Sequence, residues 1–320
     1  MSSDLLQLQL RSITYEAASI VSFELRSPNG DGLPEFTAGA HIDIHLSGGL
    51  IRSYSLVNPQ SERFRYVIAV NKDAASRGGS RLMHEALKVG AILSVSAPRN
   101  NFRLVENAPA SIFLAGGVGI TPILCMLERL TSLKKPWTLY YSARARHNAA
   151  FLERLRELRS VNAGDLHLNF DHGTVSNMLN IGSVVAAAPQ GAHLYCCGPI
   201  PMLEAFEKAC AQVPSQHVHV EYFAAKEAPS VQGGFVVELA RSGKTIPIPR
   251  GMTILDALLE AGVDAPYSCM EGVCATCETK VISGIPDHKD LVLTKEEKES
   301  NRVMMICCSG SKTEKLVLDL

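Results

Sequence analysis

Short runs of alternating hydrophobic and polar residues dominate the first hundred residues of the chain. Such alternation places one face of a β-strand in a core and the other face in solvent. Turn residues separate the runs, and this pattern predicts a small antiparallel β-barrel. The expected strands are 20–25, 41–46, 65–70 and 92–96.

The pattern changes near residue 111, where strongly apolar strands begin to alternate with amphipathic helices. Such repeats predict a parallel α/β sheet, and ligands of these sheets bind at the carboxyl ends of the strands. The expected strands are 111–115, 137–141 and 192–196, and the expected helices are 123–130, 151–159 and 201–211.

The C-terminal part returns to strands arranged around one helix. Arg241-Ser-Gly243 forms a turn between two strand-like runs and predicts a hairpin. The helix begins at Thr253, which resembles a capping box with Asp256, and ends at Gly262. Strands, one helix and a cysteine-rich loop match a β-grasp fold. The expected strands are 235–240, 244–248, 279–283 and 315–319.

These changes of pattern predict a multidomain protein. We expect domains at 1–103, 104–225 and 234–320, with a linker at 226–233. The chain has 320 residues, 46% of them hydrophobic, and a net charge of −1, which gives no sign of a nucleic-acid partner. No apolar run approaches the ~20 residues of a membrane span, and the start lacks a secretory signal. We therefore expect a cytoplasmic protein with no membrane partner.

Five of the nine cysteines lie close to the C-terminus. Cys269, Cys274 and Cys277 have the C-x4-C-x2-C spacing of plant-type [2Fe–2S] ferredoxins, in which a fourth cysteine follows later in the chain. That ligand is either Cys307 or Cys308. Zinc sites more often use paired C-x2-C knuckles, and free core cysteines are the other alternative. The spacing predicts an iron–sulfur cluster.

A glycine-rich turn follows the first strand of the predicted α/β sheet and leads into a helix. Backbone without side chains at the start of a helix can approach a pyrophosphate closely. Thr121 can cap this helix, and Pro122 suits its first turn. The turn is weak evidence alone, because Pro122 replaces the third glycine of the usual dinucleotide-binding pattern. Its glycines are Gly116, Gly117 and Gly119.

Two features of the barrel region suggest an anion or ring site. Arg52 and Tyr54 lie on one face of a predicted strand. Arg77 precedes a glycine pair that ends in Gly79, and Ser80 then opens a short helix, as in a phosphate site. Taken singly, these features could also be a surface arginine and an ordinary turn.

Together these motifs resemble the ferredoxin–NAD(P) reductase superfamily. The order of barrel, nucleotide domain and ferredoxin is similar to the phthalate dioxygenase reductase and vanillate demethylase reductase family. The resemblance covers essentially the whole chain and implies three cofactors: FMN, a [2Fe–2S] cluster and NADH. The motifs that carry it are Arg52-Ser-Tyr-Ser55, Gly78-Gly-Ser80 after Arg77, Gly116-Gly-Val-Gly-Ile-Thr-Pro122, Cys196-Cys-Gly-Pro199 and the cysteine loop.

The resemblance also implies roles for the matching positions, and its spacing favours Cys307 as the fourth cluster ligand. The strand 52–55 would line the flavin, and Phe223 would cover another part of it. No residue is expected to act as a catalytic acid or base, since hydride transfer needs mainly orientation. The flavin residues would be Arg52, Ser53, Tyr54, Ser55, Arg77, Gly79 and Ser80; those near the nicotinamide cofactor would be Gly117, Thr121, Pro122, Cys197 and Gly198, with Ser142, Arg144 and Arg146 at the adenosine ribose.

The family implies a reductase that takes hydride from NADH and delivers single electrons to a Rieske-type non-haem iron oxygenase. The partner contact would be transient and the chain a monomer. One alternative keeps the enzyme but changes the acceptor to a soluble ferredoxin or a haem protein. Another is a redox-sensing protein that is not an enzyme.

Overall fold

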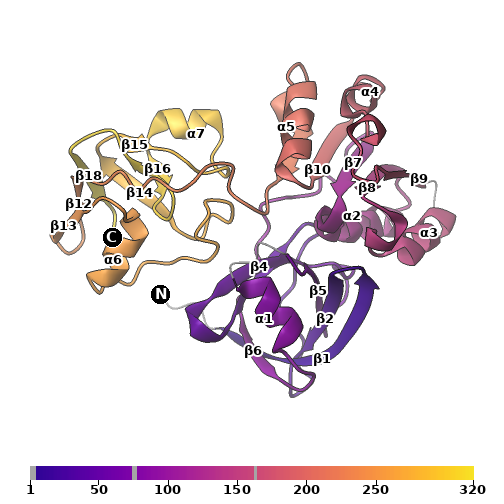
Figure 1. Ribbon diagram of the computed structural model, residues 1–320, viewed down its shortest axis with the longest axis horizontal. Coiled ribbons are helices and arrows are strands. Elements are labelled where there is room, and N and C mark those ends of the chain that lie inside the picture. The colour runs from indigo at the N-terminus through magenta and orange to yellow at the C-terminus, as the bar shows by residue number, and fades with distance from the viewer. Residues whose placement is uncertain (1–4, 74–77, 162–163) are drawn as a thin grey trace. The chain divides into compact units, whose positions relative to one another are not determined.

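The computed structural model describes residues 5–73, 78–161 and 164–320, in two compact units, Met1–Glu221 and Tyr222–Leu320 (Figure 1). The first unit contains two sheets, and the second contains one sheet of five strands and one of two strands. Among the described residues no helix is long and apolar enough to cross a membrane. Arg77, a predicted phosphate-site residue, lies outside the described residues.

Six antiparallel strands form the barrel of the first unit, in the order β4-β3-β6-β1-β2-β5. The two outer strands meet where Leu56, next to β4, pairs with Ile68 of β5, and this bridge closes the barrel. β1 was not among the predicted strands. The elements are β1 (Leu6–Ala17), β2 (Ile20–Arg26), β3 (His41–His45), β4 (Ile51–Ser55), β5 (Tyr66–Asn71), α1 (Gly79–Glu85) and β6 (Ile92–Val95).

The second sheet of this unit is fully parallel, in the order β11-β10-β7-β8-β9 (Figure 1). The chain runs outward from β7 to β9 and then returns to the other side of β7 for β10. The topological switch point therefore lies between β7 and β10. The elements are β7 (Ser111–Gly116), α2 (Ile120–Ser132), β8 (Trp137–Ala143), α3 (Leu152–Val161), β9 (Gly164–Phe170), α4 (Ile181–Ala186), β10 (His193–Cys197), α5 (Ile200–Ala209) and β11 (Val218–Glu221).

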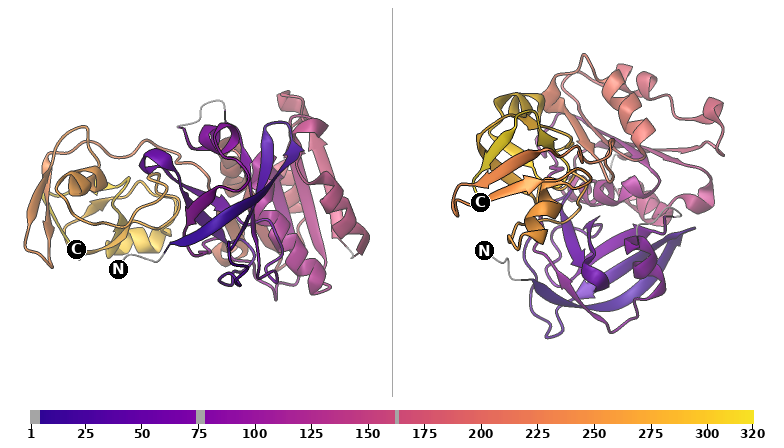
Figure 2. Two further views of the ribbon diagram at one scale, coloured as in Figure 1. Left: turned by 90° about the horizontal axis from the view of Figure 1, so that it is seen from below. Right: turned by 60° about the vertical axis from the view of Figure 1, so that its left-hand side comes forward.

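The second unit has a five-stranded mixed sheet, in the order β13-β12-β18-β14-β16, with α6 beside its strands (Figure 2). Thr253 and Asp256 form the predicted capping box at the start of α6. The predicted β-grasp architecture is thus confirmed. The elements are β12 (Phe235–Leu239), β13 (Thr245–Ile248), α6 (Ile254–Glu260), β14 (Glu278–Ser283), β15 (Pro286–Asp287), α7 (Lys295–Ser300), β16 (Val303–Met305), β17 (Gly310–Ser311) and β18 (Lys315–Leu318).

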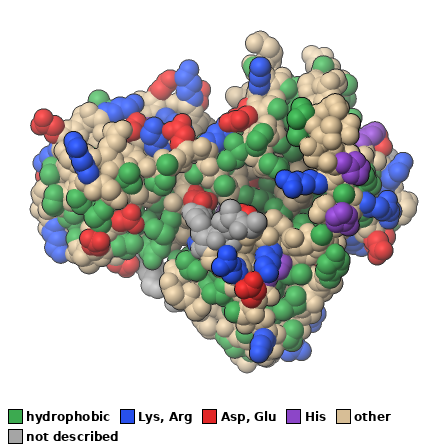
Figure 3. Space-filling model, viewed as in Figure 1, with side chains coloured by type: hydrophobic (Ala, Val, Ile, Leu, Met, Phe, Trp, Pro, Cys, Tyr) green, Lys and Arg blue, Asp and Glu red, His purple; other side chains and the backbone are tan. Residues whose placement is uncertain are grey.

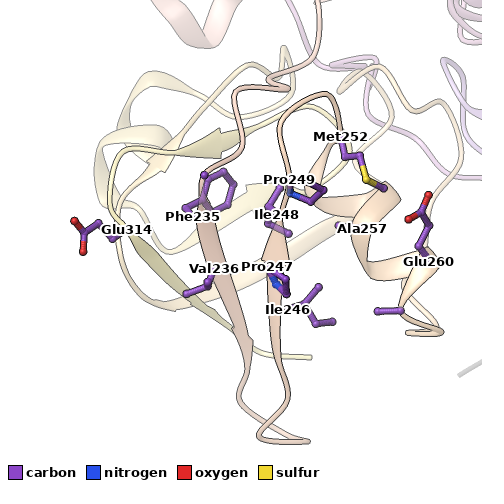
Figure 4. Close-up of a pocket in the computed structure, with 12 residues that line it drawn as sticks. Phe235, Val236, Ile246, Pro247, Ile248, Pro249, Met252, Ala257, Glu260 and Glu314 are labelled. Atoms are coloured by element: carbon purple, nitrogen blue, oxygen red, sulfur yellow. The ribbon is translucent and has the colours of Figure 1, made fainter.

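The surface of the second unit carries interspersed acidic and basic side chains (Figure 3). A pocket of about 720 Å³ lies beside the β12–β13 hairpin and α6. Figure 4 shows that its labelled residues are mostly apolar, with Glu260 and Glu314 at its margins. None of the five C-terminal cysteines lines this pocket, so it is separate from the predicted cluster site.

A buried histidine in the barrel should make the first unit sensitive to acid. Burial, with Arg99 nearby, lowers the pKa of His41 to about 4. The unfolded chain then binds more protons than the folded one below pH ~6.5, so stability is lost as the pH falls. Between pH 7.5 and 5.5, the free energy of unfolding should fall by about 1 kcal/mol less in His41→Gln than in the parent protein. The urea midpoint, followed by fluorescence of the single tryptophan, Trp137, measures this. Equal losses in both proteins would contradict it.

Candidate functional site

Two glycine turns pack against each other at the switch point of the parallel sheet. A Cβ atom at Gly119 would lie 2.1 Å from the carbonyl oxygen of Cys197, and one at Gly116 would lie 2.6 Å from Cδ of Pro199. A Cβ at Gly198 would in turn lie 3.1 Å from the Gly116 backbone. Only glycine permits this approach, and it brings the turns after β7 and β10 into one site. The space over Gly117 stays open, because a Cβ there would meet nothing within 4 Å.

The helix after the first turn begins earlier than the sequence suggested. α2 starts at Ile120, and Thr121 lies inside it with its hydroxyl donating to the carbonyl of Val118 at 3.0 Å. The prediction that Thr121 caps this helix is therefore wrong. Pro122 follows in the first turn of α2, where its missing N–H costs no helical hydrogen bond.

A buried thiol and a buried carboxyl face each other across β10 and β11. Cys197 pairs with Glu221 in the strand register. Burial raises the pKa of Glu221 to about 8, and its Oε2 atom has no hydrogen-bond partner among the described residues. Burial, together with Glu221, raises the pKa of the Cys197 thiol well above its usual value. Both groups are thus neutral near pH 7. Glu221 was not predicted as a site residue, since a lone acidic residue at a strand end belongs to no recognisable motif.

Three polar residues lie at or just after the end of β8 (Trp137–Ala143), at the edge expected for a ribose. The Ser142 hydroxyl is buried without a hydrogen-bond partner in the described part of the chain, and Arg144 is exposed. Arg146 instead lines a pocket of about 800 Å³ with Tyr15 and Arg156, among other residues. Ser142 and Arg144 do not line that pocket.

Four of the predicted flavin residues are consecutive positions of the strand β4. Ser53 donates to Oδ1 of the buried Asp43 at 2.7 Å, which holds the strand in place. Burial raises the pKa of Tyr54 to about 12, with Arg52 acting in the opposite direction, so the phenol stays neutral. Ser55 is buried at the end of the strand.

The short helix α1 lies directly against this strand. A Cβ at Gly79 would lie 2.6 Å from Cγ of Arg52, so the arginine side chain crosses the start of α1. Ser80 follows, and its hydroxyl accepts the N–H of Asp73 at 3.3 Å. Two motifs that lie apart in the sequence thus meet at one end of the barrel.

The cysteine loop of the second unit is buried and held by local contacts. The N–H groups of Cys269 and Glu271 donate to the sulfurs of Cys274 and Cys269 at 3.5 and 3.4 Å. Met270, Gly272 and Ala275 all have positive φ, between 57° and 69°. These turns point backbone N–H groups toward the sulfurs, as an iron–sulfur cluster requires.

The two candidates for the fourth ligand face different groups. The thiol of Cys307 interacts with those of Cys269 and Cys277. The sulfur of Cys308 lies 3.7 Å from the carbonyl oxygen of Met305. A Cβ atom at Gly272 would lie 2.5 Å from the same sulfur. This geometry favours Cys307 as the ligand. Phe223, at the start of the second unit, exposes 41% of its surface.

Comparison with known proteins agrees with this arrangement. Residues 113–208 match the oxidoreductase NAD-binding domain and residues 237–311 the 2Fe-2S iron-sulfur cluster binding domain. The chain is 55% identical to phenoxybenzoate dioxygenase subunit beta of Ectopseudomonas oleovorans, with 98% of this chain and 97% of the relative covered. It is 41% identical to the vanillate O-demethylase oxidoreductase of a Pseudomonas strain, over 99% and 100% of the two chains. The crystal structure of a phthalate dioxygenase reductase, 38% identical, covers 99% of this chain and 98% of its own, with a TM-score of 0.76.

The chain belongs to the phthalate dioxygenase reductase and vanillate O-demethylase oxidoreductase family. It is therefore an NADH-dependent oxidoreductase that uses FMN and a [2Fe–2S] cluster for electron transfer. The residues fit these groups: buried thiols with N–H donors suit the cluster, and the glycine turns leave a backbone surface free of side chains for the nucleotide.

The contact between the glycine turns can be tested in this reductase by Gly119→Ala. Gly119 has a helical φ of −61°, so alanine adds no backbone strain and only the clash with Cys197 remains. Overpacking on the order of 1–3 kcal/mol should raise the KM for NADH about tenfold. Gly182→Ala is the control, because its Cβ would meet nothing closer than 3.5 Å. An unchanged KM in Gly119→Ala would show that the turns need not touch.

The fourth ligand can be assigned by single substitutions. Cys307→Ser should remove the cluster's part of the visible absorbance, leaving that of the flavin, and lower the iron and acid-labile sulfide contents, because a serine cannot replace the thiolate that closes the set. Cys308→Ser should keep all three, since this sulfur faces Gly272. The reverse result would assign Cys308 to the cluster.

Proposed function

We propose that the chain is the reductase component of a Rieske-type non-haem iron oxygenase system. The observation that carries this proposal is its similarity, over nearly the full length of both chains, to a subunit of phenoxybenzoate dioxygenase and to vanillate O-demethylase oxidoreductases. The substrate class would be an aromatic acid that the oxygenase hydroxylates or demethylates, with quaternary amines as the less favoured class. The oxygenase holds that substrate, so its identity is not encoded in this chain.

The barrel residues would bind FMN. Tyr54 would pack on the ring system, with Arg52, Ser53 and Ser55 beside it, while Gly79 and Ser80 would hold the phosphate. The proximity of Arg52 to Gly79 supports one site that spans both motifs. Phe223 would cover another part of the flavin, and its exposed ring is available for this. The predicted phosphate role of Arg77 remains part of the proposal.

The switch point would bind NADH. The open surface over Gly117 would take the pyrophosphate, with Gly116, Gly119, Thr121 and Pro122 shaping the turn below it. Cys197 and Gly198 would lie near the nicotinamide. Ser142 and Arg144 would contact the adenosine ribose, and the unpartnered Ser142 hydroxyl supports this.

The chemistry itself is supplied by the bound cofactors: a flavin converts hydride transfer into one-electron steps, which is all that a [2Fe–2S] cluster accepts. The residues of the chain orient the cofactors and exclude water from the site. They do not exchange protons. Tyr54 and Cys197 suit this role, because burial keeps both uncharged. The neutral Glu221 carboxyl adds no negative charge next to the nicotinamide position.

Cys269, Cys274, Cys277 and Cys307 would hold the cluster in domain 234–320, joined by the linker 226–233 to the domains 1–103 and 104–225. The oxygenase would dock transiently at the rim of the cysteine loop, where Met270 is exposed. Redox partners commonly form such small contacts, below ~1,200 Å². The chain would act as a monomer in the cytoplasm.

A haem acceptor is the second candidate, and a specific similarity favours it. The chain is 36% identical to part of a self-sufficient cytochrome P450 monooxygenase, with a TM-score of 0.87, and covers 99% of itself but only 41% of that protein. A third possible acceptor is a quinone, since a tetrachlorobenzoquinone reductase of Sphingobium chlorophenolicum is 49% identical over 98% of both chains.

Reconstitution distinguishes these acceptors. Purified reductase would first be titrated anaerobically with NADH, which should bleach it by about three electron equivalents per chain. A Rieske-type oxygenase, a cytochrome P450 and a chlorinated quinone would then be compared as acceptors in stopped-flow experiments. Fast reduction of the oxygenase, with product formed from an aromatic acid, supports the proposal. Reduction of only the haem protein or the quinone would replace it.

Removal of one cluster ligand should separate the two halves of the reaction. Cys274→Ser should lose the cluster and electron transfer to one-electron protein acceptors. Flavin reduction by NADH should continue, because the flavin and nucleotide residues, apart from Phe223, belong to the other unit. Flavin bleaching in stopped-flow measures the first half and acceptor reduction the second. Cys210→Ala, a buried thiol of the first unit, is the control and should keep both. Loss of flavin reduction in folded Cys274→Ser would contradict this division.

A further inference from the structure

One segment of the second unit touches both parts of the chain that carry the cluster cysteines. We call residues 287–293 the cluster strap. The N–H of Leu291 donates to the carbonyl of Gly272 in the cysteine loop at 2.9 Å. The N–H of Lys289 donates to the hydroxyl of Ser309, next to the Cys307–Cys308 pair, at 3.2 Å. The strap therefore links the loop to the segment that supplies the fourth ligand.

A fully buried carboxylate lies at the centre of this strap. The Asp290 side chain is 0% exposed. Its Oδ2 atom accepts the N–H groups of Leu293 and Val292 at 2.8 and 3.2 Å. Lys298 of α7 donates to the Asp290 carbonyl and holds its ammonium 3.8 Å from Oδ2. His288 places Nδ1 3.6 Å from Oδ1. Two backbone N–H groups and one ammonium thus face Oδ2, whereas Oδ1 has no hydrogen-bond partner among the described residues.

This carboxylate lies immediately behind the cysteine loop. A Cβ at Gly272 would lie 3.1 Å from Cα and 3.3 Å from Cβ of Asp290. Gly272 lies between Cys269 and Cys274 in the sequence, so Asp290 packs against the backbone of the cysteine loop, with the sulfur of Cys308 on the same side of Gly272. Such a position, away from solvent, keeps the charge unscreened.

We propose that Asp290 is a positioning residue that also lowers the reduction potential of the cluster, with Lys298 opposing it. Reduction adds one electron, and therefore one negative charge, to a cluster that already carries four thiolates. A buried carboxylate nearby disfavours that added charge, whereas the ammonium of Lys298 favours it. The proposal rests on the ligand set proposed above. It goes beyond the ligand set because two residues that do not bind iron, Asp290 and Lys298, would adjust the driving force for electron transfer out of the cluster.

The size of the effect follows from Coulomb's law. A unit charge about 10 Å away, at an effective dielectric constant of about 20, changes an equilibrium constant on the order of tenfold. For a one-electron couple, tenfold corresponds to about 59 mV. The two substitutions that remove one charge each should therefore shift the potential in opposite directions, which a purely structural role would not do.

The test is the midpoint potential of the cluster in the complete holoenzyme, measured by spectroelectrochemistry and by EPR of the reduced cluster at one pH. Asp290→Asn keeps an oxygen that can accept the N–H groups of Val292 and Leu293 but removes the charge. Its equilibrium constant for cluster reduction should rise about tenfold. Asp319→Asn is the control, because it removes the same charge from an exposed carboxylate paired with Arg241. Its potential should not change.

Lys298→Gln removes the positive charge instead, and it should lower the equilibrium constant for cluster reduction. An unchanged potential in Asp290→Asn with an intact cluster would overturn the proposal. Should Asp290→Asn fail to hold the cluster, Lys298→Gln decides: a lower potential supports the proposal and an unchanged one overturns it. Iron and sulfide contents separate these results from failure of the ligand set, which would leave the parent protein without a cluster.

Discussion

The contact between two glycine turns at the switch point is the constraint on which the first unit depends. Gly119 and the carbonyl of Cys197 approach so closely that no side chain fits between them. This contact joins the strand that begins the α/β sheet to the strand that returns to it, β7 and β10. It creates a backbone surface to which a dinucleotide can bind, and it places Cys197 beside Glu221. A chain with larger residues at these turns could keep the sheet but would lose the site.

The second unit meets a different constraint, because its site is built from sulfur rather than from open backbone. Residues with positive φ turn the cysteine loop so that N–H groups face thiols. Such a loop has little regular structure of its own, and the cluster strap and the Cys307 segment hold it from outside. Electron transfer needs fixed distances rather than a moving acid or base. The buried polar contacts of this unit serve that need because they keep the cysteine loop rigid.

Most of the architecture was predictable because its patterns are strong. The barrel alternation, the α/β repeats and the capping box at Thr253 were confirmed, and so was the family that their order suggested. The misses have physical reasons. The second half of β1 is largely exposed and has irregular register, β11 is a four-residue edge strand, and α7 is polar all round. The start of α2 was misplaced because the Thr121 hydroxyl bonds within the first turn instead of capping it.

The site was predictable only as a set of motifs, since spacing along the chain shows which residues could meet but not what surrounds them. The cysteine spacing left Cys307 and Cys308 open, and they are separated by the contacts of Cys307 with Cys269 and Cys277 and by the packing of Cys308 against Gly272. Asp290 and Glu221 carried no motif, yet Oδ2 of Asp290 accepts two N–H groups and lies near Lys298, while burial raises the pKa of Glu221 to about 8. Two buried carboxyl groups thus have different surroundings: Oε2 of Glu221 has no hydrogen-bond partner among the described residues, whereas Oδ2 of Asp290 accepts two N–H groups. Neither residue belongs to a spacing pattern, so only the folded chain reveals that one carboxyl lies beside Cys197 and that the other residue packs against the cysteine loop.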